Sequence, residues 1–197
     1  MKMKKLLATA LVLLMSMMAC VLAFAEGWDY TITETIDCTG FTEDKTGSGW
    51  EWDHTAKTLK ITDNLLIKIT QKAGNENSGI KLPGGATLEI QKNLLVGFVA
   101  EGENFGTGYG VYSEGEITIN GTLRTVREGG DIFAVAAQKV TLGKDAQISA
   151  PSCAGVVTPK LVVDGNNTII ADHWCIKNNN NVEITGSGTL TLDCGDK

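Results

Sequence analysis

Carboxylates and aromatic rings gather in a few segments in the middle of the chain, and together they carry the most suggestive chemistry of the sequence. The carboxylates are Glu76, Glu101, Glu103, Glu128 and Asp131, and the aromatic residues are Phe105, Tyr109 and Tyr112. Ca²⁺ takes roughly six to eight oxygen ligands, so converging carboxylates can hold it. We therefore name Glu101, Glu103, Glu128 and Asp131 as candidate calcium ligands, and the three aromatic residues as candidate stacking faces for sugar rings. A solvated acidic loop edge is the alternative.

Two tryptophans form a second aromatic candidate. Trp50 and Trp52 alternate along one apolar segment, so their side chains share one face of a strand. They form either a sugar-binding platform or the packed interior of the first coil.

Catalytic chemistry finds less support. A glycosidase needs two carboxylates that flank the scissile bond, and acidic residues are too common here to nominate a pair. His54 and His173 have no nucleophile at a telling spacing. Two arginines, Arg124 and Arg127, lie beside the acidic segments and keep a lyase open as an alternative. We name no catalytic residue.

The elements that must position these side chains follow from a repeat. Between residues 135 and 192 the chain repeats three apolar segments separated by polar turns, with second segments that begin at Val140, Leu161 and Val182, 21 residues apart. Such a repeat is typical of a solenoid, in which each unit buries its apolar face against its neighbours.

The register can be followed through the second segment of every unit. Apolar pairs at i and i+2 occur at Leu59/Ile61, Leu88/Ile90, Ile117/Ile119, Val140/Leu142, Leu161/Val163 and Val182/Ile184, with steps of 29, 29, 23, 21 and 21 residues. Alternation places these pairs inward and the residues between them in water. An antiparallel sandwich also has short alternating strands, but it has no reason to repeat three segments in constant phase. We expect an all-β fold: a right-handed, single-stranded parallel β-helix of about six coils, with three strands per coil, tightening toward the C-terminus.

Three regions divide the chain. Residues 1–25 carry three lysines, an apolar run and Ala23-Phe24-Ala25, which indicates a signal peptide cleaved after Ala25. A lipoprotein anchored through Cys20 and an uncleaved anchor are alternatives. Residues 26–48 are expected to form a strand and a loop that cover the first coil, and residues 49–197 the β-helix. We expect a protein that is secreted or held at the cell surface.

The net charge of the chain excludes two classes of binding partner. Removing the leader leaves 14 basic residues against 23 acidic ones, a net charge of about −9. Phosphate binding needs a basic footprint, so nucleic acid is excluded, as is an anionic membrane once the leader is cleaved.

Four cysteines follow the leader: Cys38, Cys153, Cys175 and Cys194. Export permits disulfides, and four cysteines allow three pairings. Cys153 and Cys194 lie about one coil before and after Cys175, which favours one bridge in this column. Buried free thiols are the alternative, and no pair has the spacing of a zinc site.

Long loops follow the third segments of the first coils, at residues 70–78, 100–109 and 127–131. In a solenoid they stack along one edge, and we call them the lip. Function often lies on loops that project from a rigid scaffold, so the lip is the expected site.

Two motifs carry a resemblance. Gly49-Trp50-Glu51-Trp52-Asp53 precedes Thr58-Leu59-Lys60-Ile61, and Gly79-Ile80-Lys81-Leu82-Pro83-Gly84-Gly85-Ala86-Thr87-Leu88 follows. Over about residues 49–193 the chain resembles exported bacterial β-helix proteins described as carbohydrate-binding-domain-containing, with pectate-lyase-like architecture. The resemblance implies binding of a polysaccharide or cell-wall glycan at a cell surface. The β-helix polysaccharide lyases also resemble this fold, but they rely on calcium-binding Asp clusters and an Arg or Lys base.

Three functions are carried forward. The first is noncatalytic polysaccharide binding, with calcium as a candidate cofactor; the second is a structural or adhesive surface module; the third is a polysaccharide lyase. Only four residues follow the last strand expected, Thr189 to Asp193, so we expect further domains beyond residue 197 or a strand edge that pairs with a partner.

Overall fold

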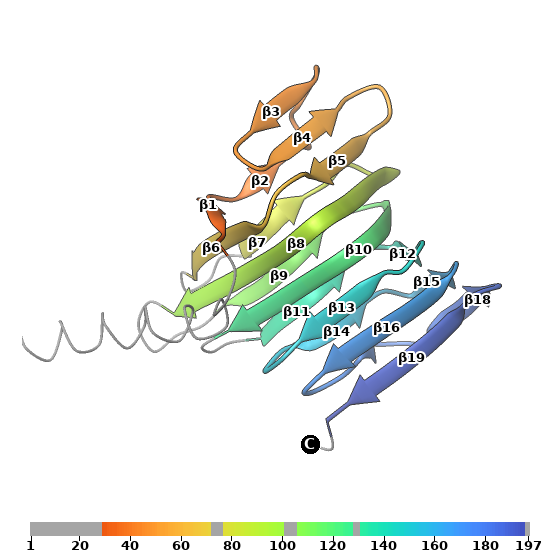
Figure 1. Ribbon diagram of the computed structural model, residues 1–197. Helices are drawn as coiled ribbons and strands as arrows, with labels where there is room; N and C mark the ends of the chain where they lie inside the picture. The colour runs from red at the N-terminus through yellow and green to blue at the C-terminus, as the bar shows by residue number, and fades with distance from the viewer. Residues whose placement is uncertain (1–28, 72–76, 101–105, 128–130, 196–197) are drawn as a thin grey trace, which may run out of the picture.

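The computed structural model describes residues 29–71, 77–100, 106–127 and 131–195, which form strands and turns (Figure 1). They build a parallel β-solenoid, as the repeat predicts, with about five turns where about six coils were expected. Nothing in these four ranges is a helix long and apolar enough to cross a membrane.

Three faces enclose the interior, and each coil contributes one strand to each face. The first face contains β2 (Ile36–Asp37), β7 (Asn77–Lys81), β9 (Thr107–Tyr112), β11 (Asp131–Ala136), β14 (Ala154–Val157) and β17 (Ile176–Lys177). The second contains β5 (Thr58–Ile61), the first halves of β8 (Ala86–Ala100) and β10 (Glu116–Arg127), β12 (Lys139–Leu142), β15 (Lys160–Val163) and β18 (Glu183–Gly186). The third contains β1 (Thr31–Thr33), β6 (Leu65–Gln71), the second halves of β8 and β10, β13 (Gln147–Ala150), β16 (Asn166–Ala171) and β19 (Thr189–Cys194).

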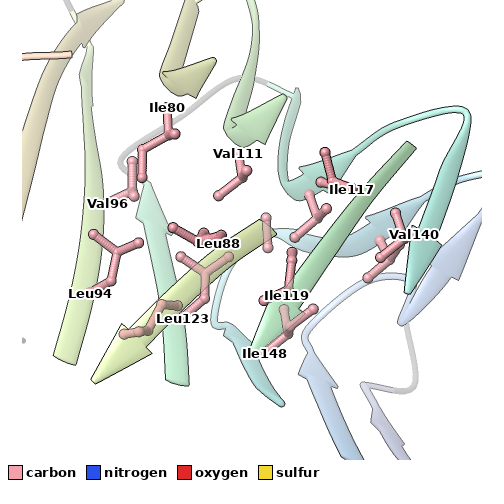
Figure 2. Close-up of a cluster of buried hydrophobic side chains, with 14 of the residues drawn as sticks. Ile80, Leu88, Leu94, Val96, Val111, Ile117, Ile119, Leu123, Val140 and Ile148 are labelled. Carbon is pink, nitrogen blue, oxygen red and sulfur yellow. The ribbon is translucent and has the colours of Figure 1, made fainter. Parts of the chain in front are cut away.

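The core is a column of aliphatic side chains that all three faces point inward. Figure 2 shows Ile80 and Val111 from the first face meeting Leu88 from the second and Leu94 from the third. Each of these four is at most 1% exposed. Burying such a side chain contributes roughly 1.5–3 kcal/mol, so stacked coils stabilise one another in a way that a single coil cannot.

Successive aliphatic pairs stack as expected, except at two steps. Leu88 lies beside Ile119 rather than Ile117, because β8 has Ile90, Gln91 and Lys92 where β10 has Gly121 alone. Gly121 has a φ of +88°, and a Cβ there would lie 2.2 Å from the carbonyl oxygen of Ile90. The bulge therefore needs glycine, and it bends the long strand from the second face into the third.

The second exception is in the last coil. Leu161 lies beside Ile184, whereas the equal spacing of the repeat placed it beside Val182. The chain takes seven residues from Lys177 to Ile184, against four between the equivalent Val157 and Leu161. The turn is three residues longer, but Lys177 comes one residue short of the 21-residue repeat after Val157. The register on the second face therefore shifts by two, and the parity of the side chains is kept.

Asparagines hold the corner between the second and third faces. Asn93 Nδ2 donates to Asn64 Oδ1 at 2.9 Å, and Asn120 Oδ1 accepts from Lys144 N at 3.1 Å. Asn167 is buried, accepts from Ala146 N at 2.8 Å and donates to Leu142 O at 3.3 Å. The amides of Asn120 and Asn167 thus bond to backbone groups of the turns, and the Asn93–Asn64 bond joins two coils through side chains.

At the N-terminal end, β1 pairs with β6 and β2 pairs with β7, so residues 31–37 add a partial coil to the edge. β3 (Lys45–Gly47) and β4 (Trp50–Asp53) then extend the second face as antiparallel strands. At the other end, Ile184 and Leu192 are 52% and 46% exposed, although the residues beside them in the preceding coil are fully buried.

One disulfide joins Cys175 to Cys194, which confirms the expected bridge in this column. Cys38 and Cys153 are free and buried.

Candidate functional site

A continuous backbone ladder runs along the corner between the first and second faces of the solenoid. Five backbone hydrogen bonds run through it from coil to coil, with N–O distances of 2.9 to 3.2 Å. They join Cys38 N to Lys81 O, Leu82 N to Tyr112 O, Ser113 N to Ala136 O, Ala137 N to Val157 O and Thr158 N to Lys177 O. The ladder therefore holds six successive levels in register.

The side chains at this corner divide into a buried column and an outer one. The donors of the ladder, Cys38, Leu82, Ser113, Ala137 and Thr158, are buried. The five residues before these donors, together with Lys177 at the sixth level, form the outer column: Asp37, Lys81, Tyr112, Ala136, Val157 and Lys177. Ala136 is itself buried, so a ligand lying along the axis would meet a different exposed side chain at each of the other five levels.

Two hollows follow this corner and share Tyr112 and Glu114 as walls. One, of about 400 Å³, is lined by residues from Asp37 and Thr39 to Pro83 and Gly84. The other, of about 570 Å³, reaches from Tyr109 through Ala136 and Gln138 to Val157, Pro159, Asn178, Asn180 and Asn181. We call the two hollows together the corner groove.

The lining of the corner groove is apolar along its floor and polar at its side. Tyr112, Ala136, Val157 and two prolines supply the apolar surface. Glu114, Gln138 and the Asn-rich turn supply carboxylate and amide groups. Such a lining can pack against a ring and hydrogen-bond to hydroxyl groups at its rim.

Tight turns fix the second wall of the groove. A Cβ on Gly115 would lie 2.7 Å from the Cα of Gly84, so the turns of neighbouring coils touch through their backbones. Lys139 pairs with Glu116 at 2.8 Å just beyond these turns.

An aromatic strip lies on the first face beside the groove, and we define it as Tyr109, Tyr112, Phe133 and Trp174. The Tyr109 ring stacks on Tyr112 and on Phe133, with centroid separations of 5.2 and 5.9 Å. The Lys177 ammonium lies 4.2 Å from the Trp174 centroid and 5.2 Å from that of Phe133. The strip therefore crosses several coils, and Lys177 joins its last two rings.

Small residues make this strip possible. Tyr109 and Tyr112 are three positions apart, and strict alternation would place them on opposite sides of β9. The paired ladder is interrupted between them at Gly110, where a Cβ would lie 2.6 Å from the carbonyl oxygen of Ala134. The corresponding positions of the neighbouring strands are Gly79, Ala134 and Gly155. This interruption turns both tyrosines outward while Val111 stays in the core.

A small hollow of about 140 Å³ lies at the lip end of the strip. Arg127, Asp131, Phe133, His173 and Trp174 contribute to its walls. Arg127 donates through Nε to Ser152 O, and its Nη2 lies 3.0 Å from His173 Nε2. These contacts hold the guanidinium against the turns that follow β13 and β16.

The structure brings together some of the residues nominated from the sequence. Tyr109 and Tyr112 meet on the first face, and Asp131 begins β11 at the edge of the same face. Trp50 and Trp52 lie on β4, at the N-terminal end of the second face, away from the tyrosines.

The two tryptophans differ in burial, and Trp52 is the one in the packed interior. Trp52 is 2% exposed and belongs to the core, so its ring is closed to a ligand. Trp50 packs against the core and stacks on Phe41 with a centroid separation of 6.1 Å.

Phe105, Glu76, Glu101, Glu103 and Glu128 lie outside the described residues, as does most of the lip. Within the described ranges, no group of three or more His, Cys, Asp or Glu side chains is placed to hold a metal ion. The calcium hypothesis therefore rests on the sequence alone.

Sequence reasoning did not nominate Phe133, Trp174, Lys177, Glu114 or Gln138. Phe133 and Trp174 were the detectable part, because each lies two residues before an aliphatic residue of its first segment, Val135 or Ile176, as Tyr109 lies before Val111. Lys177, Glu114 and Gln138 gave no signal, because apolar and polar residues do not alternate regularly in the first segments and the register of these segments is set by neighbouring coils.

No family model, no curated protein and no solved structure matches this chain in the comparisons. The function must therefore be argued from the surface itself.

Proposed function

We propose that this protein is a noncatalytic, exported module that binds polysaccharide along the corner groove and the aromatic strip, and that it acts outside the cell or at its surface. The observation that carries the proposal is the joint placement of four aromatic rings and an amide-rich groove on one face of the solenoid.

Sugar rings have an apolar face and a rim of hydroxyl groups, and this surface offers a partner for each. Tyr109, Tyr112 and Phe133 present half-buried rings whose stacking already fixes their orientation. Rings ordered before binding lose little side-chain entropy when a ligand packs on them. Gln138 and the asparagines beside them can donate to and accept from hydroxyls.

The scaffold also suits a long ligand. The groove follows the stacking direction, and an unbroken backbone ladder holds its successive levels in register. The chain has a formal net charge of −6, which favours neutral polymers over anionic ones.

The test is affinity electrophoresis over a panel of neutral and acidic plant and bacterial polysaccharides. We expect retardation of the wild type by at least one neutral polymer, and about a tenfold loss of affinity in Tyr112→Ala, because the variant removes a ring shared by both hollows. Glu89→Ala is the matched control, since Glu89 lies on the second face, away from the groove. If no polymer retards the protein, or if Tyr112→Ala binds like the control, the proposal fails and a structural surface module becomes the better description.

Two further measurements test the calcium hypothesis and the lyase alternative. EDTA in the gel tests the calcium hypothesis, because a calcium-assisted site loses affinity and an amide-aromatic site does not. Prolonged incubation with the retained polymer should leave its chain length unchanged. Release of unsaturated oligosaccharides would establish a lyase instead.

A further inference from the structure

We propose that the ligand is a linear, neutral glycan bound in an extended conformation along the solenoid axis, with about one sugar unit per coil and a full site of about six units. This inference rests on the proposed function and adds the shape, charge and length of the ligand.

The repeat distance of the groove comes from the fold. Neighbouring strands in a sheet lie about 4.8 Å apart, so the five steps between the six levels of the ladder span about 24 Å. In an extended chain with equatorial linkages, the length of one pyranose unit is close to this strand spacing. Sugar and coil can therefore remain in phase over the whole groove.

The levels of the groove are chemically different. Its middle is the apolar floor formed by Tyr112, Ala136 and Val157, which suits the faces of sugar rings. Its two ends are polar, with Thr39 at one end and Asn180 at the other. The middle should therefore supply most of the affinity for a short chain, whereas only a long chain can reach both ends.

The charges of the corner groove favour a neutral chain. Asp37 and Glu114 line the hollow nearer the N-terminus together with Lys81, so carboxylates outnumber ammonium groups there. Lys177 stands at the other end of the outer column, but its ammonium already lies over the rings of Trp174 and Phe133. A carboxylate on every sugar would meet Glu114 and Asp37 without a matching row of cations.

The backbone ladder also argues against recognition of a chain end. The hydrogen bonds continue without interruption from Cys38 to Thr158, and the two hollows adjoin at Tyr112 and Glu114. A site for a chain terminus needs a closed wall, whereas this surface continues along the axis.

Isothermal titration with cello-, xylo- and β-1,3-gluco-oligosaccharides of two to seven units tests the inference. For at least one series we expect affinity to rise with each added unit and to level off at about six units, the number of levels in the ladder. The corresponding oligouronates should bind at least tenfold more weakly.

Variants at the two ends locate the chain. Thr39→Ala and Asn180→Ala should each weaken binding of the hexamer about fivefold, the effect of losing one hydrogen bond, and leave binding of the trimer unchanged. Glu89→Ala should change neither.

The outcomes separate this inference from the proposed function. If polymers are retained in a Tyr112-dependent way but affinity levels off at one or two units, or if the end variants weaken trimer and hexamer equally, the extended site is wrong and the function stands. Preferred binding of oligouronates refutes neutrality. If neither polymers nor oligosaccharides bind, both proposals fail.

Discussion

The buried amide of Asn167 gives a sharp test of how the coils are held in register. This side chain is 2% exposed and lies at the corner between the second and third faces. Its Oδ1 accepts from Ala146 N at 2.8 Å, and its Nδ2 donates to Leu142 O at 3.3 Å. Asn167→Ala removes both contacts without adding bulk.

The substitution affects the two backbone groups that contact Asn167 differently. Leu142 O keeps a hydrogen bond from Asp164 N at 2.8 Å, whereas the Ala146 N–H loses the acceptor that Asn167 provides. An unsatisfied buried donor costs about 1–3 kcal/mol, and the small cavity adds to it. We therefore expect the free energy of unfolding to fall by about 2–3 kcal/mol.

Urea denaturation followed by far-ultraviolet circular dichroism measures this change, and Asn120→Ala is the matched control. Asn120 Oδ1 accepts from Lys144 N at 3.1 Å at an exposed site, where water replaces the lost acceptor. The control should lose less than about 1 kcal/mol. A loss below 0.5 kcal/mol for Asn167→Ala, on the order of measurement error, or equal losses for the two variants, would refute the reasoning.

Two further predictions concern the cysteines. Replacing Cys175 and Cys194 together by alanine opens a covalent loop of 19 residues and should lower the free energy of unfolding by about 3 kcal/mol. Hydrogen exchange should show that β19 loses protection before β13. Equal protection in both strands would contradict the assignment of the loss to the last coil. Burial raises the pKa of Cys38 and Cys153 from 9.0 to about 12, with Asp37 adding to the effect at Cys38. Because the unfolded chain releases these protons above pH 9 while the folded chain keeps them, the free energy of unfolding should fall between pH 9 and 12, by at most about 1.4 kcal/mol per pH unit for each thiol. The decline should be shallower in Cys153→Ala, and an equal decline would refute the contribution of that thiol.

The parallel solenoid could be predicted from the sequence because its signal is local and repeated. Each second segment places two aliphatic residues on one side of a strand, and six segments in the same phase identify the interior without knowledge of their neighbours. The asparagine corner was likewise accessible, since Asn and Gly mark turns through their own backbone preferences.

The same reasoning could not foresee the two steps at which the register shifts by two residues. A shift of two leaves every side chain on its original face, so hydrophobic alternation is blind to it. The bulge opposite Gly121 and the long turn before Ile184 become visible only when the paired strands are seen together.

The candidate surface was the part of the structure that the sequence predicted least. By itself the sequence fixes the inward pairs and therefore the faces, because burial of aliphatic side chains dominates each strand. The tertiary structure decided that Tyr109 and Tyr112 stack, because the close approach of neighbouring coils at Gly110 interrupts the alternation. It also decided that Trp52 is core, because β4 pairs with β5 and places Trp52 beside the buried Leu59. It also placed Phe133, Trp174 and the groove on one face, since that grouping depends on how far each coil travels before it returns to the same edge.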